Sequence, residues 1–132
     1  MSKRKFLYVI PCYNEKENIN NIFKSILENT SSIKNYEADF CFVDDGSTDN
    51  SWSNIIELHN NNNNVYGIKL SKNFGKESAI DAGLNFARED YSFYIIIDAD
   101  NQHPTNKIIS MIEIYEKEKL DIVNTYRIDE NE

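Results

Sequence analysis

Apolar and polar residues alternate along this chain in a pattern that predicts strands and helices in succession. Short apolar runs with many β-branched residues, typical of buried strands, cover residues 6–10, 40–43, 65–70, 94–97 and 122–126. The segments between them repeat apolar residues every three or four positions, as amphipathic helices do. The order βαβαβαβαβ predicts one α/β domain over residues 1–132, with a mostly parallel, doubly wound sheet and helices on both of its faces.

Each predicted helix carries an apolar stripe that we expect to face the sheet. The four stripes are Ile19, Ile22, Phe23, Ile26 and Leu27; Trp52, Ile55 and Ile56; Ala79, Ala82, Gly83, Phe86 and Ala87; and Ile108, Met111, Ile112 and Tyr115. Asn14, with Glu17 three residues later, matches a capping box and predicts the start of the first helix. Thr48 or Asp49 is expected to cap the second helix, and Pro104 suits the first turn of the fourth.

Three predicted strands end on polar residues, at positions 11–15, 44–49 and 98–100. Because the carboxyl ends of parallel strands share one edge, we expect these clusters to converge on one crevice, where open α/β sheets bind ligands. Two like charges roughly 4 Å apart repel by about 4 kcal/mol at an effective dielectric near 20. A divalent metal would neutralise four converging carboxylates and would admit an anionic diphosphate.

Asp98 and Asp100 directly follow the apolar run 94–97, around which the site is expected to form. In an extended chain their side chains share a face. Their oxygens, with the carbonyl of Gln102, suit Mg²⁺ or Mn²⁺. Taken alone, an Asp-x-Asp triplet is equally compatible with two surface acids in a turn. Its position at the end of a buried strand favours the metal site.

Other residues in the clusters suit a nucleotide. Asp45 can accept a hydrogen bond from a base, and Tyr13 offers a ring on which a base can stack, although ordinary packing explains a tyrosine equally well. Lys76 can meet a phosphate at the start of the third helix, or can simply be solvated. The sequence has neither a G-x-G-x-x-G after the first strand nor a Walker Lys-Ser/Thr. A usual dinucleotide fold and a P-loop are therefore not expected.

Composition excludes some functional classes. The formal net charge of −8 at pH 7 argues against a nucleic-acid partner, which requires a basic face. No apolar run is long enough to span a bilayer, and the basic N-terminus lacks the apolar segment of a signal peptide. Cys12 and Cys41 are interpreted as buried free thiols of a cytosolic protein. The asparagines at 60–64 are interpreted as a solvated helix end and turn.

Four motifs together resemble the family 2 glycosyltransferases. They are V-I-P-C-Y-N-E at 9–15, V-D-D-G-S-T-D at 43–49, N-F-G-K-E at 73–77 and D-A-D-N-Q-H-P at 98–104. The set looks most like the polyprenyl-phosphate branch, the undecaprenyl-phosphate glucosyltransferases and dolichol-phosphate mannosyltransferases. The resemblance implies a GT-A fold and a metal-dependent enzyme. It would transfer sugar from a UDP- or GDP-sugar to a polyprenyl phosphate in cell-wall or surface-glycan synthesis.

The resemblance also implies roles for individual positions. The implied nucleotide-binding residues are Pro11, Tyr13, Glu15, Asp44, Asp45, Lys76, Asp98 and Ala99, and the implied metal ligands are Asp98, Asp100 and Gln102. Asp45, with Asp44 beside it, would hold the base and ribose, and Lys76 would lie near the phosphates. The metal would act as a Lewis acid on the departing nucleoside diphosphate.

Members of this family continue well beyond the matching segment, and their later part supplies the acceptor site and a carboxylate base. We therefore expect the chain to be the N-terminal, donor-binding part of a longer enzyme, with its base beyond Glu132, and to be inactive alone. The full-length protein is expected at the cytoplasmic face of the membrane. Apolar surface near Ile95, Ile97, Ile122 and Val123 is expected to be uncovered and to favour a homo-oligomer.

Two other interpretations remain open, and a third is disfavoured. A different family 2 transferase would act on a capsule or O-antigen glycan, and a non-catalytic module would only bind the nucleotide sugar. A receiver-like signalling domain also surrounds Mg²⁺ with acids and a lysine. It would place its acid pair after the first strand and a lone Asp after the third. Here the acids follow the second and fourth strands, which argues against a receiver.

Overall fold

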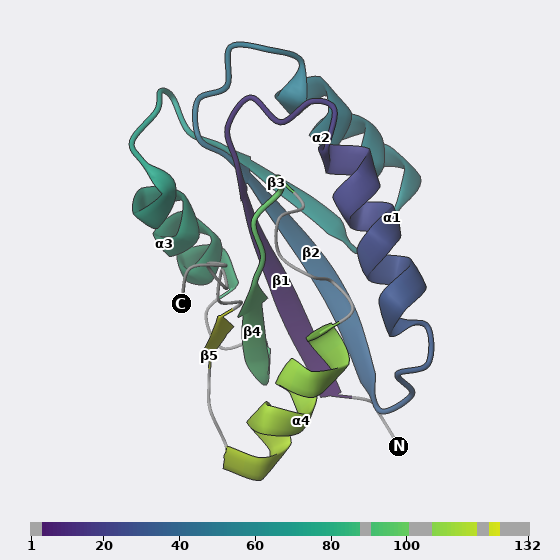
Figure 1. The fold of residues 1–132 in the computed structure, drawn as a ribbon. Helices are drawn as coiled ribbons and strands as arrows, with labels where there is room; N and C mark the ends of the chain where they lie inside the picture. Colours follow the sequence, from purple (N-terminus) through teal and green to yellow (C-terminus); the bar gives the residue numbers. More distant parts are fainter. Residues whose placement is uncertain (1–3, 88–90, 101–106, 119–121, 125–132) are drawn as a thin grey trace, which may run out of the picture.

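A computed structural model of the chain describes residues 4–87, 91–100, 107–118 and 122–124. In chain order the elements are β1 (Arg4–Cys12), α1 (Ile19–Thr30), β2 (Tyr36–Asp44), α2 (Ser51–Asn61), β3 (Val65–Lys69), α3 (Lys76–Ala87), β4 (Phe93–Ile96), α4 (Ile108–Glu118) and β5 (Ile122–Asn124). The strands form a parallel sheet in the order β3-β2-β1-β4-β5 (Figure 1). The predicted alternation and the parallel sheet are confirmed.

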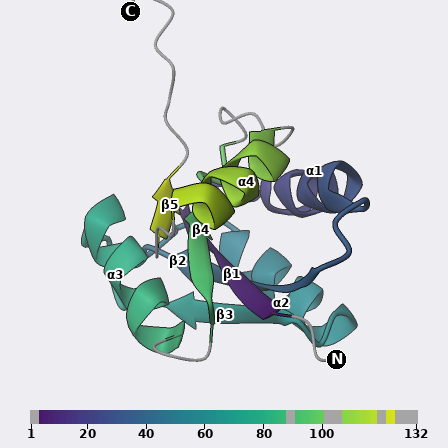
Figure 2. The ribbon, with the colours of Figure 1, turned by 90° about the horizontal axis from the view of Figure 1, so that it is seen from below.

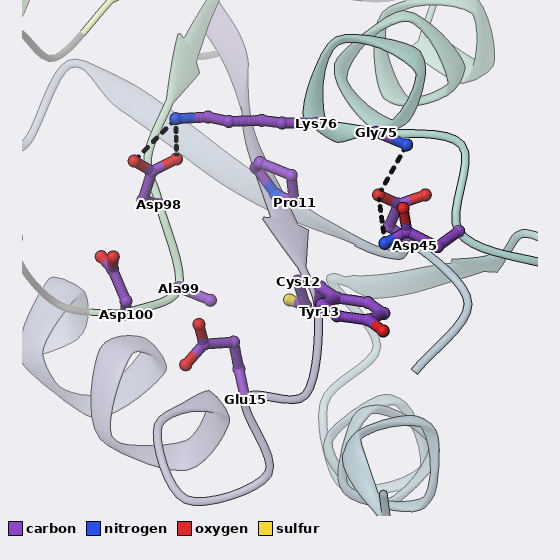
Figure 3. Close-up of a pocket in the computed structure, with 11 residues that line it drawn as sticks. Pro11, Cys12, Tyr13, Glu15, Asp45, Gly75, Lys76, Asp98, Ala99 and Asp100 are labelled. Atoms are coloured by element: carbon purple, nitrogen blue, oxygen red, sulfur yellow. Dashed lines mark hydrogen bonds and ion pairs between the residues drawn. The ribbon is translucent and has the colours of Figure 1, made fainter. Parts of the chain in front are cut away.

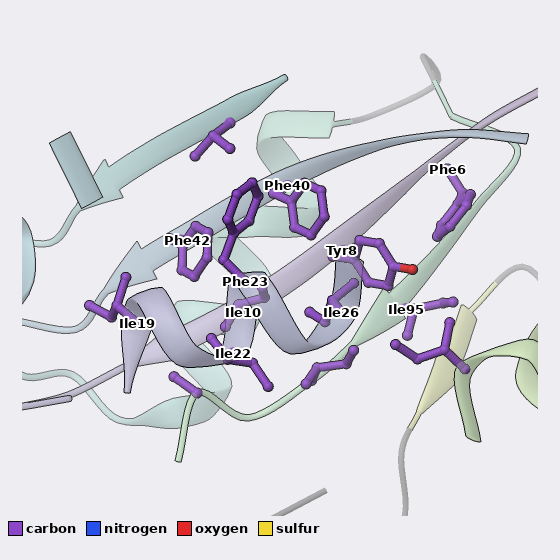
Figure 4. Close-up of a cluster of buried hydrophobic side chains, with 14 of the residues drawn as sticks. Phe6, Tyr8, Ile10, Ile19, Ile22, Phe23, Ile26, Phe40, Phe42 and Ile95 are labelled. Atoms are coloured by element: carbon purple, nitrogen blue, oxygen red, sulfur yellow. The ribbon is translucent and has the colours of Figure 1, made fainter. Parts of the chain in front are cut away.

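Helices cover both faces of the sheet because side chains alternate along each strand. On one face, which we call the aromatic face, Phe6, Tyr8 and Phe40 belong to a buried cluster (Figure 4). The same cluster contains side chains of α1, α2 and α4, which cover this face. On the other face, α3 packs against Leu7 and Val9. Figure 2 shows α1 and α4 side by side on one side of the sheet, with α3 away from them.

The connection β4-α4-β5 differs in hand from the other three. From β1 to β2 the chain moves one way along the sheet with α1 on the aromatic face, whereas from β4 to β5 it moves the opposite way with α4 on that same face. Two such connections have opposite hands, and about 98% of parallel crossovers are right-handed. The result is that α4 lies beside α1 rather than beside α3.

β1 extends two residues beyond its predicted end, through Pro11. The ladder between β1 and β4 ends at the pair Val9–Ile96, and the last backbone bond on that side runs from the Ile97 N–H to the Val9 carbonyl. Pro11 lies two residues after Val9, so its backbone faces the same neighbour, β4. The pairing with β4 has already ended at this point, so the missing N–H of Pro11 costs no hydrogen bond of the sheet. A proline is therefore tolerated in this central strand.

Several predicted boundaries and orientations are wrong. β2 begins at Tyr36 rather than at residue 40. Leu27, Ile56 and Phe86 were expected to face the sheet but are 45%, 42% and 45% exposed, at the edges of their helical stripes. Pro104, and the predicted end of the last strand at residues 125–126, lie outside the described residues.

The expected uncovered face near the end of the sheet is not seen at Ile95 or Ile97. Both side chains are buried, at 0% and 1% exposure, in the cluster that α4 helps to cover. The expectation of exposed apolar surface is therefore wrong for these two residues, because it did not place α4 on the aromatic face. The side chains of Ile122 and Val123 lie outside the described part. Within the described ranges no helix is long and apolar enough to cross a membrane.

Candidate functional site

The three polar clusters meet at the carboxyl edge of the sheet. β1 lies between β2 and β4, so the strand order reverses there, and the loops after these strands flank one crevice. A cavity of about 460 Å³ opens at this point (Figure 3). It is lined by Pro11, Cys12, Tyr13, Glu15, Asp45, Asn73, Gly75, Lys76, Asp98, Ala99 and Asp100. The predicted convergence of the clusters is confirmed.

Most of the predicted site residues line this cavity. Asp44 is the exception among the predicted nucleotide contacts, since it is fully buried and its Oδ1 accepts a hydrogen bond from the Ser47 N–H at 3.1 Å. Gln102, the third predicted metal ligand, lies outside the described residues. Sequence reasoning assigned no role to three lining residues, Cys12, Asn73 and Gly75. Asn73 and Gly75 belong to the N-F-G-K-E motif, and this motif is the sequence feature that could have identified them as lining residues.

Asn14 ties the loop after β1 to the loop after β2. Its backbone has a φ of 51°, a left-handed conformation that asparagine tolerates better than most residues. Its N–H donates to Ser47 Oγ at 2.9 Å, and its Oδ1 accepts from the Thr48 N–H at 2.8 Å. The capping box predicted at Asn14 is therefore wrong, because its side chain bonds the other loop and α1 begins only at Ile19.

Asp49 and Ser51 form a second tie between the same loops. The Ser51 N–H and hydroxyl donate to Asp49 Oδ1, at 2.8 and 2.5 Å, and Ser51 Oγ accepts from the Glu15 N–H at 2.8 Å. Burial alone would raise the pKa of Asp49. The hydrogen bonds from Ser51 and from the Lys16 N–H, with the charge of Lys16, outweigh burial and hold that pKa below its usual value. The N-cap of α2 is Asn50 rather than Thr48 or Asp49, and the Asn50 side chain makes no capping hydrogen bond.

The Asp45 carboxylate holds the loop before α3. Its Oδ1 accepts from the Phe74 N–H at 2.8 Å. Its Oδ2 accepts from the Gly75 N–H at 3.0 Å (Figure 3) and from Asn73 Nδ2 at 3.3 Å. Its own N–H donates to the Cys12 carbonyl at 2.8 Å. Only 3% of Asp45 is exposed. Three donors therefore compensate the desolvation of a buried charge.

Gly46 allows this loop to approach closely. Its φ is 74°, and a Cβ at this position would collide with the backbone of Lys72 and Asn73. Gly75 also has a positive φ, of 105°, but a Cβ there would meet nothing within 4 Å. The requirement at Gly46 is therefore both steric and conformational, whereas at Gly75 it is conformational alone.

Cys12 lies in the cavity wall, where its surroundings disfavour the thiolate form that a nucleophile needs. Both Cys12 and Cys41 are buried free thiols, as predicted. Burial, followed by the charge of Asp44, raises the pKa of Cys12 well above its usual value, and burial raises that of Cys41 to about 12. A thiol held protonated does not attack a substrate.

Lys76, the first residue of α3, reaches across the cavity to the end of β4 (Figure 3). Its Nζ lies 2.6 Å from Asp98 Oδ1 and 2.7 Å from Asp98 Oδ2. The lysine side chain is 55% exposed and the aspartate side chain 19%. Among the described lining residues, this single ammonium accompanies the carboxylates of Glu15, Asp45, Asp98 and Asp100. The cavity is therefore acidic, and an anionic ligand would need a further cation.

The described residues fit a metal that takes part of its coordination from a ligand. Within the described ranges, no group of three His, Cys, Asp or Glu side chains is arranged to hold an ion. Asp98 and Asp100 nevertheless supply two carboxylates to one cavity wall. Mg²⁺ is commonly held by one or two carboxylates together with substrate phosphates, so this donor set suits a metal that arrives with a diphosphate.

Comparison with known proteins identifies the family. The sequence model described as Glycosyl transferase family 2 matches residues 8–132. The chain belongs to glycosyltransferase family 2. It is 37% identical over 124 residues to the undecaprenyl-phosphate 4-deoxy-4-formamido-L-arabinose transferase of Proteus mirabilis, a match covering 93% of this chain and 37% of that protein. The chain spans about a third of the length of the curated relatives it matches.

Solved structures of glycosyltransferases share the fold. The S. aureus TarS fragment 1–349 in complex with UDP superposes with a TM-score of 0.66 at 23% identity, over 86% of this chain and 32% of that one. The mannosyltransferase PcManGT of Pyrobaculum calidifontis, with GDP-Man and Mn²⁺, gives a TM-score of 0.63 at 22% identity, over 83% and 31%. This family 2 chain therefore has the GT-A fold that the motifs implied.

Proposed function

We propose that the cavity is the donor site of a glycosyltransferase and binds a nucleoside diphosphate sugar together with Mg²⁺ or Mn²⁺. The observation that carries this proposal is the arrangement of the cavity around β1. Tyr13 and Asp45 lie on the β2 side, Asp98 and Asp100 end β4 on the other side, and Lys76 reaches between them. A nucleotide needs an aromatic ring for its base and charges for its phosphates, and this cavity combines the two. Membership of family 2 supports the same function.

The proposed roles follow from exposure and position. The Tyr13 ring is 45% exposed and can stack on a base, with Pro11 and Glu15 beside it in the wall. Asp45 shapes the base and ribose end through the loop that it holds. Lys76, at the N-terminus of α3, is positioned to meet phosphate oxygens.

Asp98 and Asp100 would hold the metal, which supplies Lewis-acid stabilisation to the departing nucleoside diphosphate when bound. Ala99, between the two acids, lines the cavity wall and is 1% exposed. The protein's own contribution is to fix these carboxylates at the end of a buried strand. Rigid placement of this kind means that little reorganisation is needed when the donor binds.

The acceptor is proposed from the relatives and applies to the whole protein. The name of the P. mirabilis relative, undecaprenyl-phosphate 4-deoxy-4-formamido-L-arabinose transferase, contains a polyprenyl phosphate and a sugar. We therefore propose a polyprenyl phosphate as acceptor and the cytoplasmic face of the membrane as the place of reaction. We propose UDP as the nucleotide, as in the TarS complex, with GDP as the alternative, as in the PcManGT complex with GDP-Man.

Calorimetry with UDP tests the donor site. UDP should bind in the presence of Mn²⁺ and lose most of its affinity in EDTA. Asp100→Asn should weaken metal-dependent binding by about 10- to 100-fold, since a contact to a charged group contributes about 1.5–3 kcal/mol. Asp81→Asn, the same change on the exposed side of α3, is the matched control and should bind as the wild type does. Equal affinity for UDP with Mn²⁺ and with EDTA would refute the metal-dependent site.

A further inference from the structure

We propose that Lys76 is an internal counter-ion that competes with the metal for Asp98, so that metal and diphosphate bind together and each binds poorly alone. The proposal rests on the proposed donor site and adds to it an order of events. In the donor-free state Lys76 neutralises Asp98. When a diphosphate enters, the ammonium moves to the phosphates and releases the carboxylate for the metal.

The geometry of the ion pair carries this inference. Lys76 Nζ contacts both oxygens of Asp98, at 2.6 and 2.7 Å, and so lies across the whole carboxylate edge. A metal ion bound through either oxygen would lie close to the ammonium, and two cations repel strongly at such a separation. Metal binding to Asp98 therefore requires the ammonium to leave.

The backbone around Lys76 is held in place, so only the Lys76 side chain has to move. The preceding loop is fixed, because Asp45 accepts the N–H groups of Phe74 and Gly75. The Lys76 side chain is 55% exposed, and its stem is long and flexible with a compact charge at its end. The ammonium can therefore swing from Asp98 to a phosphate in the same cavity while the backbone of α3 stays in place.

The metal ion and the diphosphate each favour the state in which the Lys76 ammonium has left Asp98, so each must strengthen the binding of the other. Phosphate binding draws Lys76 away and makes Asp98 available to the metal, and metal binding at Asp98 makes the ammonium available to phosphate. This coupling is reciprocal by thermodynamic necessity. A direct bond between metal and phosphate would also couple the two ligands, but that contribution does not depend on Lys76. The part that Lys76 adds can be measured by substitution.

The test measures Mn²⁺ binding from the electron paramagnetic resonance signal of the free ion, using the 132-residue chain alone, with uridine and with UDP. Three variants are compared with the wild type. Lys76→Gln removes the charge, and Lys76→Arg keeps both the charge and the ability to pair with Asp98. Lys72→Gln is the matched control. It removes one charge from the same loop, but the Lys72 ammonium lies over the Phe74 ring, 5.2 Å from its centroid.

With no nucleotide, Lys76→Gln should bind Mn²⁺ about two- to five-fold more tightly than the wild type, which is the range for releasing a half-exposed ion pair. In the same variant UDP should bind more weakly, and the factor by which UDP enhances Mn²⁺ binding should fall. If Lys76 had a purely structural role, its replacement would not strengthen Mn²⁺ binding and weaken UDP binding at the same time. Lys76→Arg should behave as the wild type does. Uridine, which lacks phosphates, should not enhance Mn²⁺ binding.

Two results would overturn the proposal while leaving the donor site intact. One is that Lys76→Gln shows no gain in Mn²⁺ affinity beyond that of Lys72→Gln, although UDP still binds with Mn²⁺. The other is that uridine enhances Mn²⁺ binding as much as UDP does, because release of Asp98 would then not depend on the phosphates. If UDP fails to bind the wild type under any condition, the donor site itself is wrong. The Mn²⁺-only comparison still decides whether Lys76 shields Asp98.

Discussion

Replacing Asp45 by asparagine should destabilise the fold and loosen the loop before α3. The carboxylate accepts three hydrogen bonds, one at Oδ1 from the Phe74 N–H and two at Oδ2 from the Gly75 N–H and Asn73 Nδ2. An asparagine has nearly the same shape but only one acceptor oxygen. Its NH₂ group would face at least one of the backbone donors, so one hydrogen bond is lost and the others lose their charge.

The magnitude follows from these contacts. A hydrogen bond to a charged group contributes about 1.5–3 kcal/mol, and a neutral one about half as much. Losing one charged backbone bond and weakening the other would cost roughly 2–4 kcal/mol. The third bond, from Asn73 Nδ2, is long at 3.3 Å and adds little. Relief of the desolvation of a buried carboxylate offsets part of this loss. We therefore expect the free energy of unfolding of Asp45→Asn to be about 2–3 kcal/mol lower than that of the wild type.

Urea denaturation measures this difference, and amide hydrogen exchange locates it. Asp39→Asn is the matched control because it makes the same chemical change in the first half of β2, outside the cavity lining. Within the described ranges, the Asp39 carboxylate accepts a hydrogen bond from the Tyr91 hydroxyl at 2.6 Å, and an amide oxygen can accept the same bond. The reasoning is refuted if Asp45→Asn loses no more stability than Asp39→Asn and the Phe74 and Gly75 amides keep their protection.

Two further predictions concern the same loops. Gly46→Ala should lower the free energy of unfolding, measured by urea denaturation, by more than Gly75→Ala does. Both glycines have a positive φ, which alone costs about 1–2 kcal/mol, but only a Cβ at position 46 meets the backbone of another segment. Equal losses in the two variants would argue against this close approach. The folded-state pKa of Asp49 is lowered, so its contribution to stability is present above the unfolded pKa, near 3.9, and is lost as pH falls through the folded value. Urea unfolding from pH 6 downward should show the stability of the wild type approaching that of Asp49→Asn, and a constant difference between the two would contradict this.

The sequence was sufficient for the parts of the fold that depend on periodicity. Buried strands and helical stripes can be recognised from apolar spacing, and polar residues after a buried strand indicate a ligand edge. Asp98 and Asp100 were found in this way, and the structure places both in the cavity wall. Their role as metal ligands remains a prediction.

The sequence was insufficient where a tertiary contact overrides a local rule. Asn14 and Glu17 have the spacing of a capping box, but the Asn14 side chain instead bonds the Thr48 N–H of another loop. Nothing local to residue 14 reports that competition. The position of α4 is a second case. Handedness statistics would place it on the same face as α3, whereas it lies against α1.

The N-F-G-K-E motif illustrates how a short pattern acquires a physical meaning only in three dimensions. Asn73 donates its side-chain amide to Asp45, and Gly75 donates its N–H to the same carboxylate while adopting a φ of 105°. Lys76 follows immediately and neutralises Asp98. The loop therefore connects Asp45, which follows β2, with Asp98, which follows β4, across the intervening strand β1. A change at Asp45 can therefore reach Asp98 through the four residues 73–76. The Asp45 and Lys76 variants should for this reason be compared in the same Mn²⁺ titrations. If the loop transmits the effect, Asp45→Asn will weaken the Lys76–Asp98 pair and will raise Mn²⁺ affinity in the same direction as Lys76→Gln.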